Sequence, residues 1–336
     1  MLNIVSCGNS DDDLIGNWVS LYDVEPGGRS DAVSVSVNNI GYFGTGINTD
    51  NTVDRYRDWW KVDFSNKKPN YTKLDSIPGV ARSGAVAFAI GEDIYVGGGY
   101  DGEKRLNDFY KYSITDGLWA QIDSFPGVAR YGAVAFSVNG KGYVGTGLAN
   151  NYTYLNDFYC YDPLTSKWTK AGSFGGTKRY EAVVFVINDV AYLATGKKDG
   201  YVSDFWKYNG TTNEWTQLRD IYNTDEDNSY DDDYDDIVRS QGVAFVSGEK
   251  GYEKGYITTG GKGGSGRSTW EYDPATDLWN EKTSFEGVSR GGSVSFTIND
   301  YGYVLTGSTS STYFSDIWRF DPNAEQDDTD NGSTVF

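Results

Sequence analysis

The twelve residues IPGVARSGAVAF at 77–88 return almost unchanged as FPGVARYGAVAF at 125–136. Duplication along a chain predicts a repeated structural unit, and this restricts the fold more than composition does. Aligning the chain on the arginine of this motif recovers six copies, with successive separations of 53, 48, 49, 60 and 51 residues. The six arginines are Arg29, Arg82, Arg130, Arg179, Arg239 and Arg290.

Each copy reads as four short strands separated by turn residues. A run of small and apolar residues follows the arginine, and a Gly/Thr-Gly element such as YVGTG at 143–147 ends the second strand. Four copies carry a tyrosine seven residues before the tryptophan of the fourth strand, as in Tyr112 and Trp119. A unit of about 50 residues with four strands is typical of one blade of a β-propeller.

The two ends of the chain complete one another. The sixth copy stops after FDPN at 320–323 and lacks its tryptophan strand, whereas GNWVSL at 16–21 precedes Arg29 as GLWAQI precedes Arg130. We therefore predict an all-β fold, a six-bladed propeller over 16–322, whose ring is closed by an N-terminal strand that completes the last blade. Residues 1–15 would form an acidic tether and residues 323–336 a disordered tail.

The glycine doublet, the Tyr-x6-Trp spacing and the recurring arginine resemble kelch repeats across residues 16–322. The resemblance implies a kelch propeller similar to the central domain of galactose oxidase and to sialic-acid mutarotase. Its functional implications are broad, since kelch propellers include protein-binding adaptors, a copper oxidase and a mutarotase. The copper chemistry of that oxidase family needs histidines, and this chain contains none.

Composition excludes several further classes. A net charge of −19 argues against a nucleic-acid partner, because phosphate backbones need clustered Lys and Arg. The absence of histidine removes Ser-His-Asp triads, Cys-His pairs and histidine-ligated metals. We expect no cofactor, no metal and a monomer.

The N-terminal segment carries a separate signal. Ile4–Cys7 resembles a bacterial lipobox with Cys7 as the lipidated residue, and Asp11–Asp13 is similar to the surface-export signal of Bacteroidetes-type lipoproteins. Only six residues precede Cys7, so the basic and apolar regions of a signal peptide are missing. This predicts an outer-membrane or cell-surface lipoprotein, or a periplasmic one, that reaches the membrane only through a lipid on Cys7. The alternative is an acidic tail with an incidental cysteine.

An acidic insertion, TDEDNSYDDDYDDI at 224–237, explains the 60-residue separation. Closely spaced carboxylates suit Ca²⁺, but the EF-hand pattern with its turn glycine is absent. We expect a flexible, solvated loop that emerges beside the arginines and folds over the mouth of the channel.

Candidate ligand-binding residues gather on one predicted face. In kelch folds the connections between blades and the loops joining second to third strands share that face, and here they hold more than half of the 29 basic residues with many tyrosines. Beside the six arginines these include Arg55, Arg57, Lys104, Arg105, Lys178, Lys197, Lys198, Lys262, Arg267, Tyr56, Tyr100, Tyr131, Tyr152, Tyr180, Tyr201 and Tyr313. Such a face suits an anionic sugar. The alternative for the six arginines is structural pairing with aspartates that recur at the third strand, namely Asp58, Asp108, Asp157, Asp204 and Asp316, with Ser268 in the remaining copy.

The positions that break the repeat are the more informative ones. Two residues after each arginine stand three glycines and three exceptions, Asp31, Glu181 and Gln241. With Tyr131 and Tyr180 they would line the channel mouth asymmetrically, and Glu181 is the best carboxylate for acid–base chemistry. Each of them singly also fits a polar residue that only hydrates the channel.

The ligand-binding residues predicted for the face are Arg29, Asp31, Arg57, Arg82, Arg130, Tyr131, Arg179, Tyr180, Glu181, Arg239, Gln241 and Arg290. The leading hypothesis is a non-catalytic surface protein that binds a glycan or a protein on this face. One alternative is a sugar mutarotase or epimerase for sialic-acid-like substrates, which would use Glu181, Tyr180 and Arg179. The other is a scaffold in an envelope complex.

Overall fold

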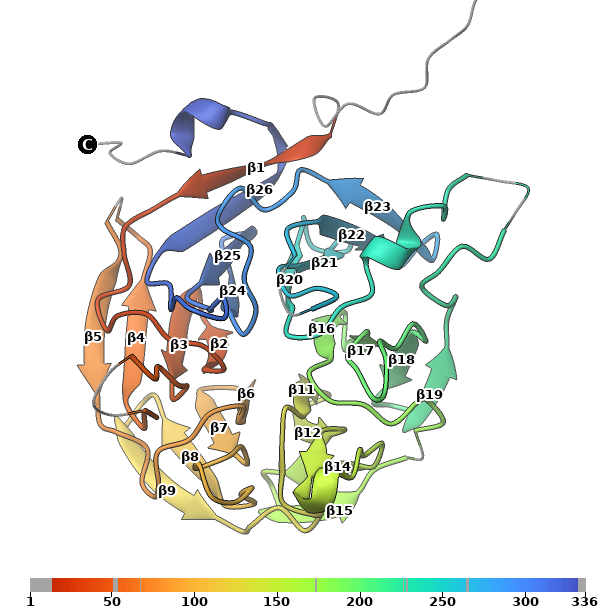
Figure 1. Ribbon diagram of the computed structural model, residues 1–336. Coiled ribbons are helices and arrows are strands. Elements are labelled where there is room, and N and C mark those ends of the chain that lie inside the picture. Colours follow the sequence, from red (N-terminus) through yellow and green to blue (C-terminus); the bar gives the residue numbers. More distant parts are fainter. Residues whose placement is uncertain are drawn as a thin grey trace, which may run out of the picture.

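The computed structural model describes residues 14–50, 54–66, 68–172, 174–225, 227, 229–263 and 266–331. It confirms the all-β prediction: six four-stranded antiparallel sheets stand around a central axis as the blades of a propeller (Figure 1). No helix in this part of the chain is long and apolar enough to cross a membrane.

Each blade runs from an innermost to an outermost strand in chain order. Blade 1 holds β2 (Val33–Val37), β3 (Ile40–Gly44), β4 (Trp59–Asp63) and β5 (Asn70–Leu74). Blade 2 holds β6 (Val86–Ile90), β7 (Asp93–Gly97), β8 (Phe109–Ser113) and β9 (Leu118–Ile122). Blade 3 holds β11 (Val134–Val138), β12 (Lys141–Gly145), β14 (Phe158–Asp162) and β15 (Lys167–Lys170).

The second half of the ring repeats this order. Blade 4 holds β16 (Val183–Ile187), β17 (Val190–Ala194), β18 (Trp206–Asn209) and β19 (Glu214–Gln217). Blade 5 holds β20 (Val243–Ser247), β21 (Lys254–Thr258), β22 (Thr269–Asp273) and β23 (Leu278–Lys282). Blade 6 holds β24 (Val294–Ile298), β25 (Tyr301–Leu305), β26 (Ile317–Glu325) and, from the N-terminal end, β1 (Ile15–Ser20).

The predicted closure by the N-terminal strand is confirmed. Strand β1 pairs antiparallel with β26, and Trp18 lies opposite Phe320 in the register. The Trp18 ring is fully buried, with its centroid 5.0 Å from that of Phe285 in an edge-on contact. Strand β1 thus supplies the outermost strand of the last blade and covers the edge that β26 would otherwise expose, so the two ends of the chain stabilise each other.

The C-terminal segment differs from the disordered tail expected from residue 323. Strand β26 continues to Glu325, and a short 3-10 helix, η4, follows at Asp328–Asp330. Asn17 Nδ2 of β1 donates to Asp330 Oδ2 over 3.0 Å, which ties the two ends together a second time.

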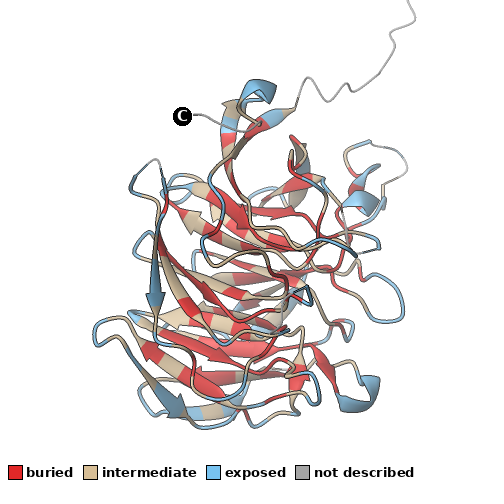
Figure 2. Cartoon of the chain, turned by 60° about the vertical axis from the view of Figure 1, so that its left-hand side comes forward, coloured by how far each residue is buried: buried red, intermediate tan, exposed pale blue. Residues whose placement is uncertain are grey.

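The core consists of six hydrophobic clusters, one at each junction between neighbouring blades, and the buried band follows the middle strands (Figure 2). Close approach of the blades explains a glycine that precedes the second-strand tyrosine. A Cβ on Gly142 of blade 3 would lie 2.0 Å from the Phe88 ring of blade 2. The neighbouring Tyr143 stacks on Phe136 with ring centroids 5.2 Å apart.

The part of the acidic insertion that the structure describes packs against the blades, in contrast to the flexible loop expected from its composition. Tyr234 and Ile237 are buried in the cluster between blades 4 and 5. The Tyr234 hydroxyl accepts a hydrogen bond from the Trp279 backbone N–H at 2.7 Å and donates to the Trp279 carbonyl at 3.1 Å. The segment packs on the outer part of blade 5 (Figure 1), so the prediction that it covers the channel mouth is wrong.

Candidate functional site at the channel mouth

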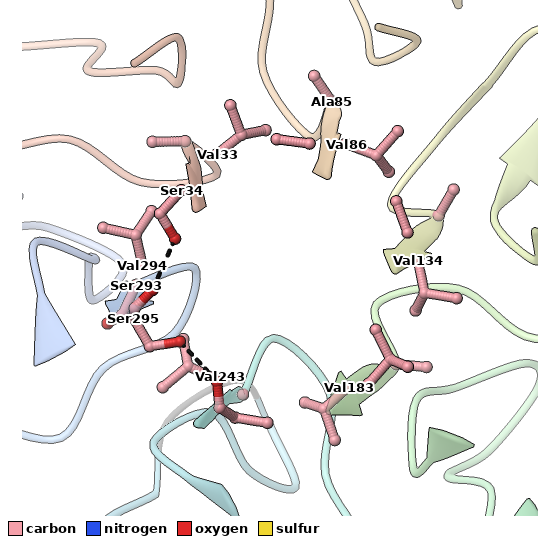
Figure 3. A pocket seen from close by; sticks show the side chains of 18 residues that line it. Val33, Ser34, Ala85, Val86, Val134, Val183, Val243, Ser293, Val294 and Ser295 are labelled. Carbon is pink, nitrogen blue, oxygen red and sulfur yellow. Dashed lines mark hydrogen bonds between the residues drawn. The ribbon is translucent and has the colours of Figure 1, made fainter. Parts of the chain in front are cut away.

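The innermost strands surround a central channel (Figure 3). Its wall alternates small residues that face the axis with valines that pack between blades. The few polar groups bond to the wall itself: Ser34 Oγ donates to the Ser295 carbonyl at 2.9 Å, and Ser295 Oγ donates to the Ala244 carbonyl at 2.8 Å. The wall of alanine, valine and serine offers no charged group, so the channel interior is a poor place for specific recognition.

Around the channel, the six repeated arginines form a buried layer. None of them is more than 2% exposed. Arg82 shows the pattern: its two terminal nitrogens each donate to one oxygen of Asp108 at 2.8 Å, and it also donates to the carbonyls of Gly98 and Val80. The same ion pair recurs as Arg29–Asp58, Arg130–Asp157, Arg179–Asp204 and Arg290–Asp316.

Arg239 is also held by hydrogen bonds, but it has no carboxylate partner. Its guanidinium donates to the carbonyls of Thr259, Ser268 and Asp236 and to the Ser268 hydroxyl. Burial lowers the pKa of Arg239 to about 10, which leaves it a cation at neutral pH. The six arginines thus fasten loops to blades. Burial of the six side chains and the use of most of their donors within the protein argue against the predicted ligand-binding role; among these donors, Arg29 Nε is buried without a hydrogen-bond partner.

Next to this layer along the chain, the residues two positions after the arginines form a closed ring of backbone hydrogen bonds. Each N–H donates to the carbonyl of the equivalent residue in the preceding blade, over 2.7 to 3.3 Å. The N–H groups of Asp31, Gly84, Gly132, Glu181, Gln241 and Gly292 all take part. We call these six residues the mouth ring.

All six members of the mouth ring have left-handed backbone conformations, with φ from +52° to +65°. Glycine adopts this region freely, whereas other L-residues incur roughly 1–2 kcal/mol of steric strain. Three copies use glycine, yet Asp31, Glu181 and Gln241 occupy the same conformation. Backbone strain of this kind, at positions where glycine would be unstrained, is often found at functional sites.

A cavity of about 350 Å³ lies at the mouth over blades 1 to 4. This mouth cavity falls in the size range of small-molecule sites, roughly 300–1,000 Å³. Gly84 and Gly132 of the mouth ring belong to its lining, where the absence of a side chain leaves room. The full lining is Asp31, Ile47, Arg55, Ser83, Gly84, Tyr100, Arg105, Tyr131, Gly132, Tyr152 and Glu181.

Two arginines of the mouth cavity are held against tyrosine rings. The guanidinium carbon of Arg55 lies 5.0 Å from the Tyr100 ring centroid. That of Arg105 lies 5.1 Å from the Tyr131 ring, 5.8 Å from Tyr152 and 5.9 Å from Tyr100. In contrast to the buried layer, both side chains are partly exposed. They combine donors for an anion with rings that can cover an apolar face.

Glu181 is a buried carboxyl in the lining of the mouth cavity. Its side chain is 14% exposed, and Oε2 is buried with no hydrogen-bond partner. Burial raises the pKa of Glu181 to about 7, against the opposing effect of Lys197, whose Nζ lies 3.6 Å from Oε2. The carboxyl therefore exchanges protons near neutral pH, which is the range in which a general acid or base works best.

Asp31 lies across the mouth ring from Glu181 and has a similar character. Burial raises the pKa of Asp31 to about 6, and Arg55 partly offsets this increase. The negative charge of Asp31 also raises the pKa of Glu181, so the two carboxyls act on each other. Burial likewise raises the pKa of Tyr131 to about 12, which keeps this phenol protonated at neutral pH.

The structure thus brings Asp31, Tyr131 and Glu181 of the predicted site into one cavity. Arg57 is exposed and lies outside the cavity lining, as do Tyr180 and Gln241. Arg55 and Arg105 take the place that sequence reasoning gave to Arg57 and the repeated arginines. Their signal was the presence of cations and tyrosines in the loops of blades 1 to 3. Cys7 lies outside the described residues, and among those described no group of three or more His, Cys, Asp or Glu could hold a metal ion.

Comparisons with known proteins agree with this architecture. Residues 18–178 match the KLHDC2/KLHL20/DRC7 kelch-repeats domain. This match makes the first three blades kelch repeats, and the structure continues the same four-stranded blade around the rest of the ring. A solved structure entitled "Structure of YjhT" superimposes with a TM-score of 0.71 over 88% of this chain and 95% of that one, at 19% identity, which supports the fold alone.

The sequence relatives are matched over a shorter stretch. N-acetylneuraminate epimerases of Salmonella enteritidis and Salmonella typhimurium are 28% identical over 93 residues. This stretch is 26% of the chain and 22–23% of those proteins, so less than a quarter of their length is matched.

Proposed function

We propose that this kelch propeller binds an acidic sugar in the mouth cavity. The observation that carries the proposal is the pair Arg55 and Arg105, partly exposed and held against tyrosine rings around a 350 Å³ cavity. An arginine can hold a carboxylate with two hydrogen bonds, and a tyrosine ring can cover the apolar face of a pyranose. The partial match to N-acetylneuraminate epimerases supports an acidic sugar of the sialic type.

The test is a panel of sugars measured by isothermal titration calorimetry. N-acetylneuraminic acid, galacturonic acid and glucuronic acid are compared with neutral galactose and glucose. We expect the acidic sugars to bind, with affinity that falls as salt rises, because the contact is largely ionic. Binding of neutral sugars alone, or of none, would contradict the proposal and direct attention to a protein partner in an envelope complex.

Two variants locate the site. Arg105→Ala should weaken binding of the acidic sugar at least tenfold, since both a donor pair and the packing of three tyrosines are lost. Arg319→Ala is the matched control, because Arg319 also stacks on a tyrosine, Tyr301 at 4.7 Å, but lies outside the cavity lining. Equal affinity of both variants would place the site elsewhere.

A second candidate function, sugar mutarotation, is favoured by Glu181. Its buried carboxyl with a pKa of about 7 could take the proton of an anomeric hydroxyl while an acid group protonates the ring oxygen as the C–O bond breaks. Reclosure on the other face returns both protons and leaves the other anomer. Arg179 cannot position the substrate as predicted, because its ion pair with Asp204 is buried; Tyr131 and Arg105 are the groups that accompany Glu181 in the mouth cavity.

Anomer exchange separates the two functions. NMR line shapes or saturation transfer on N-acetylneuraminic acid report the exchange rate with and without protein. If the protein is a mutarotase, wild type accelerates exchange, and Glu181→Gln abolishes the acceleration while binding is kept. No acceleration by wild type would leave sugar binding as the function.

We also propose that the propeller is held at the cell surface by a lipid on Cys7. The proposal is supported by Ile4–Cys7 and by the acidic run that follows. Mass spectrometry of the protein purified from its own host membranes would show a diacylglyceryl group on Cys7. An unmodified thiol there would refute the anchor without affecting the sugar site.

A further inference from the structure

A row of tyrosines continues past the mouth cavity onto blade 4. Tyr100 and Tyr131 belong to the cavity lining, while Tyr180 and Tyr154 lie outside it. Neighbouring ring centroids are 6.2 Å apart for Tyr100 and Tyr131, 6.0 Å for Tyr131 and Tyr180, and 5.8 Å for Tyr180 and Tyr154. We call these four residues the tyrosine row. A single sugar that fills the cavity would leave Tyr180 and Tyr154, the far half of the tyrosine row, uncovered.

Short backbone ladders at the top of the blades fix the tyrosine row. Tyr131 lies in a two-residue strand, β10 (Arg130–Tyr131), paired with β13 (Leu148–Ala149). Leu148 in turn forms a bridge to Tyr154, and Tyr180 forms one to Lys197. Because the backbone under each ring is hydrogen-bonded, the row is preorganised and loses little conformational entropy on binding.

Cations accompany three of the four rings, those of Tyr100, Tyr131 and Tyr180. Arg55 lies 5.0 Å from the Tyr100 ring, Arg105 lies 5.1 Å from Tyr131, and Lys197 lies 5.2 Å from Tyr180. The Lys197 side chain is 35% exposed, and Tyr154 and Tyr180 are partly exposed. Repeated pairs of ring and cation match a chain whose units each carry an apolar face and a carboxylate.

The tyrosine row does not continue onto blade 5. The positions equivalent to Tyr180 and Lys197 are Ser240 and Gly261, which form the corresponding bridge. In blade 6 the same bridge joins Gly291 to Ser308. Small residues at these positions carry neither ring nor cation. The fold therefore needs only the backbone bridge, and the side chains on blades 2 to 4 serve another purpose.

We propose that the binding site is extended and takes an acidic oligosaccharide: one unit occupies the mouth cavity, and the next lies on Tyr180, Tyr154 and Lys197. This inference rests on the proposed binding of an acidic sugar and specifies its length. The second subsite is distinct from the cavity because none of these three residues contributes to the cavity lining. A free monosaccharide would use only the first subsite.

The experiment measures affinity against chain length. N-acetylneuraminic acid and galacturonic acid are titrated into the whole protein, each beside its own dimer, trimer and tetramer. We expect the dissociation constant of one series to fall at least tenfold between monomer and trimer. Tyr154→Ala should remove most of this gain while the monomer binds as in wild type. Tyr252→Ala, an exposed tyrosine in the hairpin between β20 and β21, is the matched control and should change neither value.

The outcomes separate the two proposals. Equal affinity for all chain lengths would overturn the extended site while leaving sugar binding intact. Weakening of monomer and trimer alike by Tyr154→Ala would also overturn it, since Tyr154 would then act on the cavity. Absence of binding by every member of both series would refute the proposed function itself, and the extended site with it.

Discussion

Two sets of residues at the mouth of this propeller, the buried arginines and the mouth ring, treat the sixfold repeat in opposite ways. The buried layer holds six arginines, none of them more than 2% exposed, and each donates side-chain hydrogen bonds to the protein. The mouth ring, two residues further along each copy, keeps one backbone conformation in all six blades but varies its side chains. Repetition in the buried layer fastens the connecting loops to the blades, whereas variation in the mouth ring shapes a cavity over blades 1 to 4.

The comparison also separates two kinds of basic residue that look alike in the sequence. Arg82 is covered by protein and shares its donors with Asp108, while Arg105 is partly exposed and lies among three tyrosines. Arg82 can therefore contribute to stability but not to ligand recognition. Arg105 can contribute to ligand recognition and little to stability. The predictions below test this division, starting with the largest expected effect.

Arg82→Ala should lower the free energy of unfolding by about 3–5 kcal/mol, because it leaves the partly buried Asp108 without its ionic partner. The carbonyls of Gly98 and Val80 would lose their donor as well. Urea denaturation followed by tryptophan fluorescence measures the change. Asp108→Ser is the informative companion, since it copies the arrangement of Arg239 and Ser268 in blade 5 and should cost much less. A mild effect of Arg82→Ala would mean that the buried layer is not a structural requirement.

Glu181 should make stability depend on pH in an unusual direction. Its folded pKa of about 7 exceeds the ordinary value of 4.5, so the folded state binds more protons than the unfolded state between these values. Stability therefore falls as pH rises from about 4.5 to 7, by on the order of 3 kcal/mol for this group. Denaturation midpoints between pH 4.5 and 8 should show a steeper decline for wild type than for Glu181→Gln. Parallel profiles would show that Glu181 titrates normally.

Most of the architecture could be predicted from the repeat, because the same four-stranded unit recurs six times. The number of blades, the N-terminal closure and the pairing of five of the six arginines with an aspartate all follow from spacing. The prediction of a solvated loop for the acidic insertion was wrong for a physical reason. Its composition indicates solvent exposure, but Tyr230, Tyr234 and Ile237 recur at intervals of three or four residues and pack against blade 5.

The site was less accessible to prediction because it depends on where loops without a repeat place their side chains. Arg55 and Arg57 are only two residues apart, and sequence reasoning chose Arg57. The β-bridge between Ile47 and Arg55 fixes the register of the loop, so that Arg55 and not Arg57 lines the cavity. The exceptions Asp31 and Glu181 were recognisable in advance because they replace glycine in a repeat.

Glu181→Gly should stabilise the fold by about 1 kcal/mol while it removes the proposed acid–base group. Glycine adopts the φ of +54° without strain, and a poorly solvated carboxylate disappears. Gly132→Ala is the reciprocal change and should destabilise, because its Cβ would lie 3.3 Å from the Tyr180 ring in a left-handed conformation. Thermal and urea denaturation measure both. A destabilised Glu181→Gly variant would show that the side chain supports the mouth ring.

The smallest expected change in stability belongs to Arg105→Ala, and it completes the comparison with Arg82. Arg105 makes two hydrogen bonds, from Nε to the Leu148 carbonyl at 3.1 Å and to Asn150 Oδ1 at 3.3 Å, and both lie at the partly exposed rim. Losing them should change the free energy of unfolding by no more than about 0.5 kcal/mol, while affinity for the acidic sugar falls at least tenfold. Arg82→Ala should show the opposite ratio of the two effects in the same assays. If Arg105→Ala unfolds the protein as readily as Arg82→Ala, both arginines are structural, and the variation in the mouth ring needs another explanation.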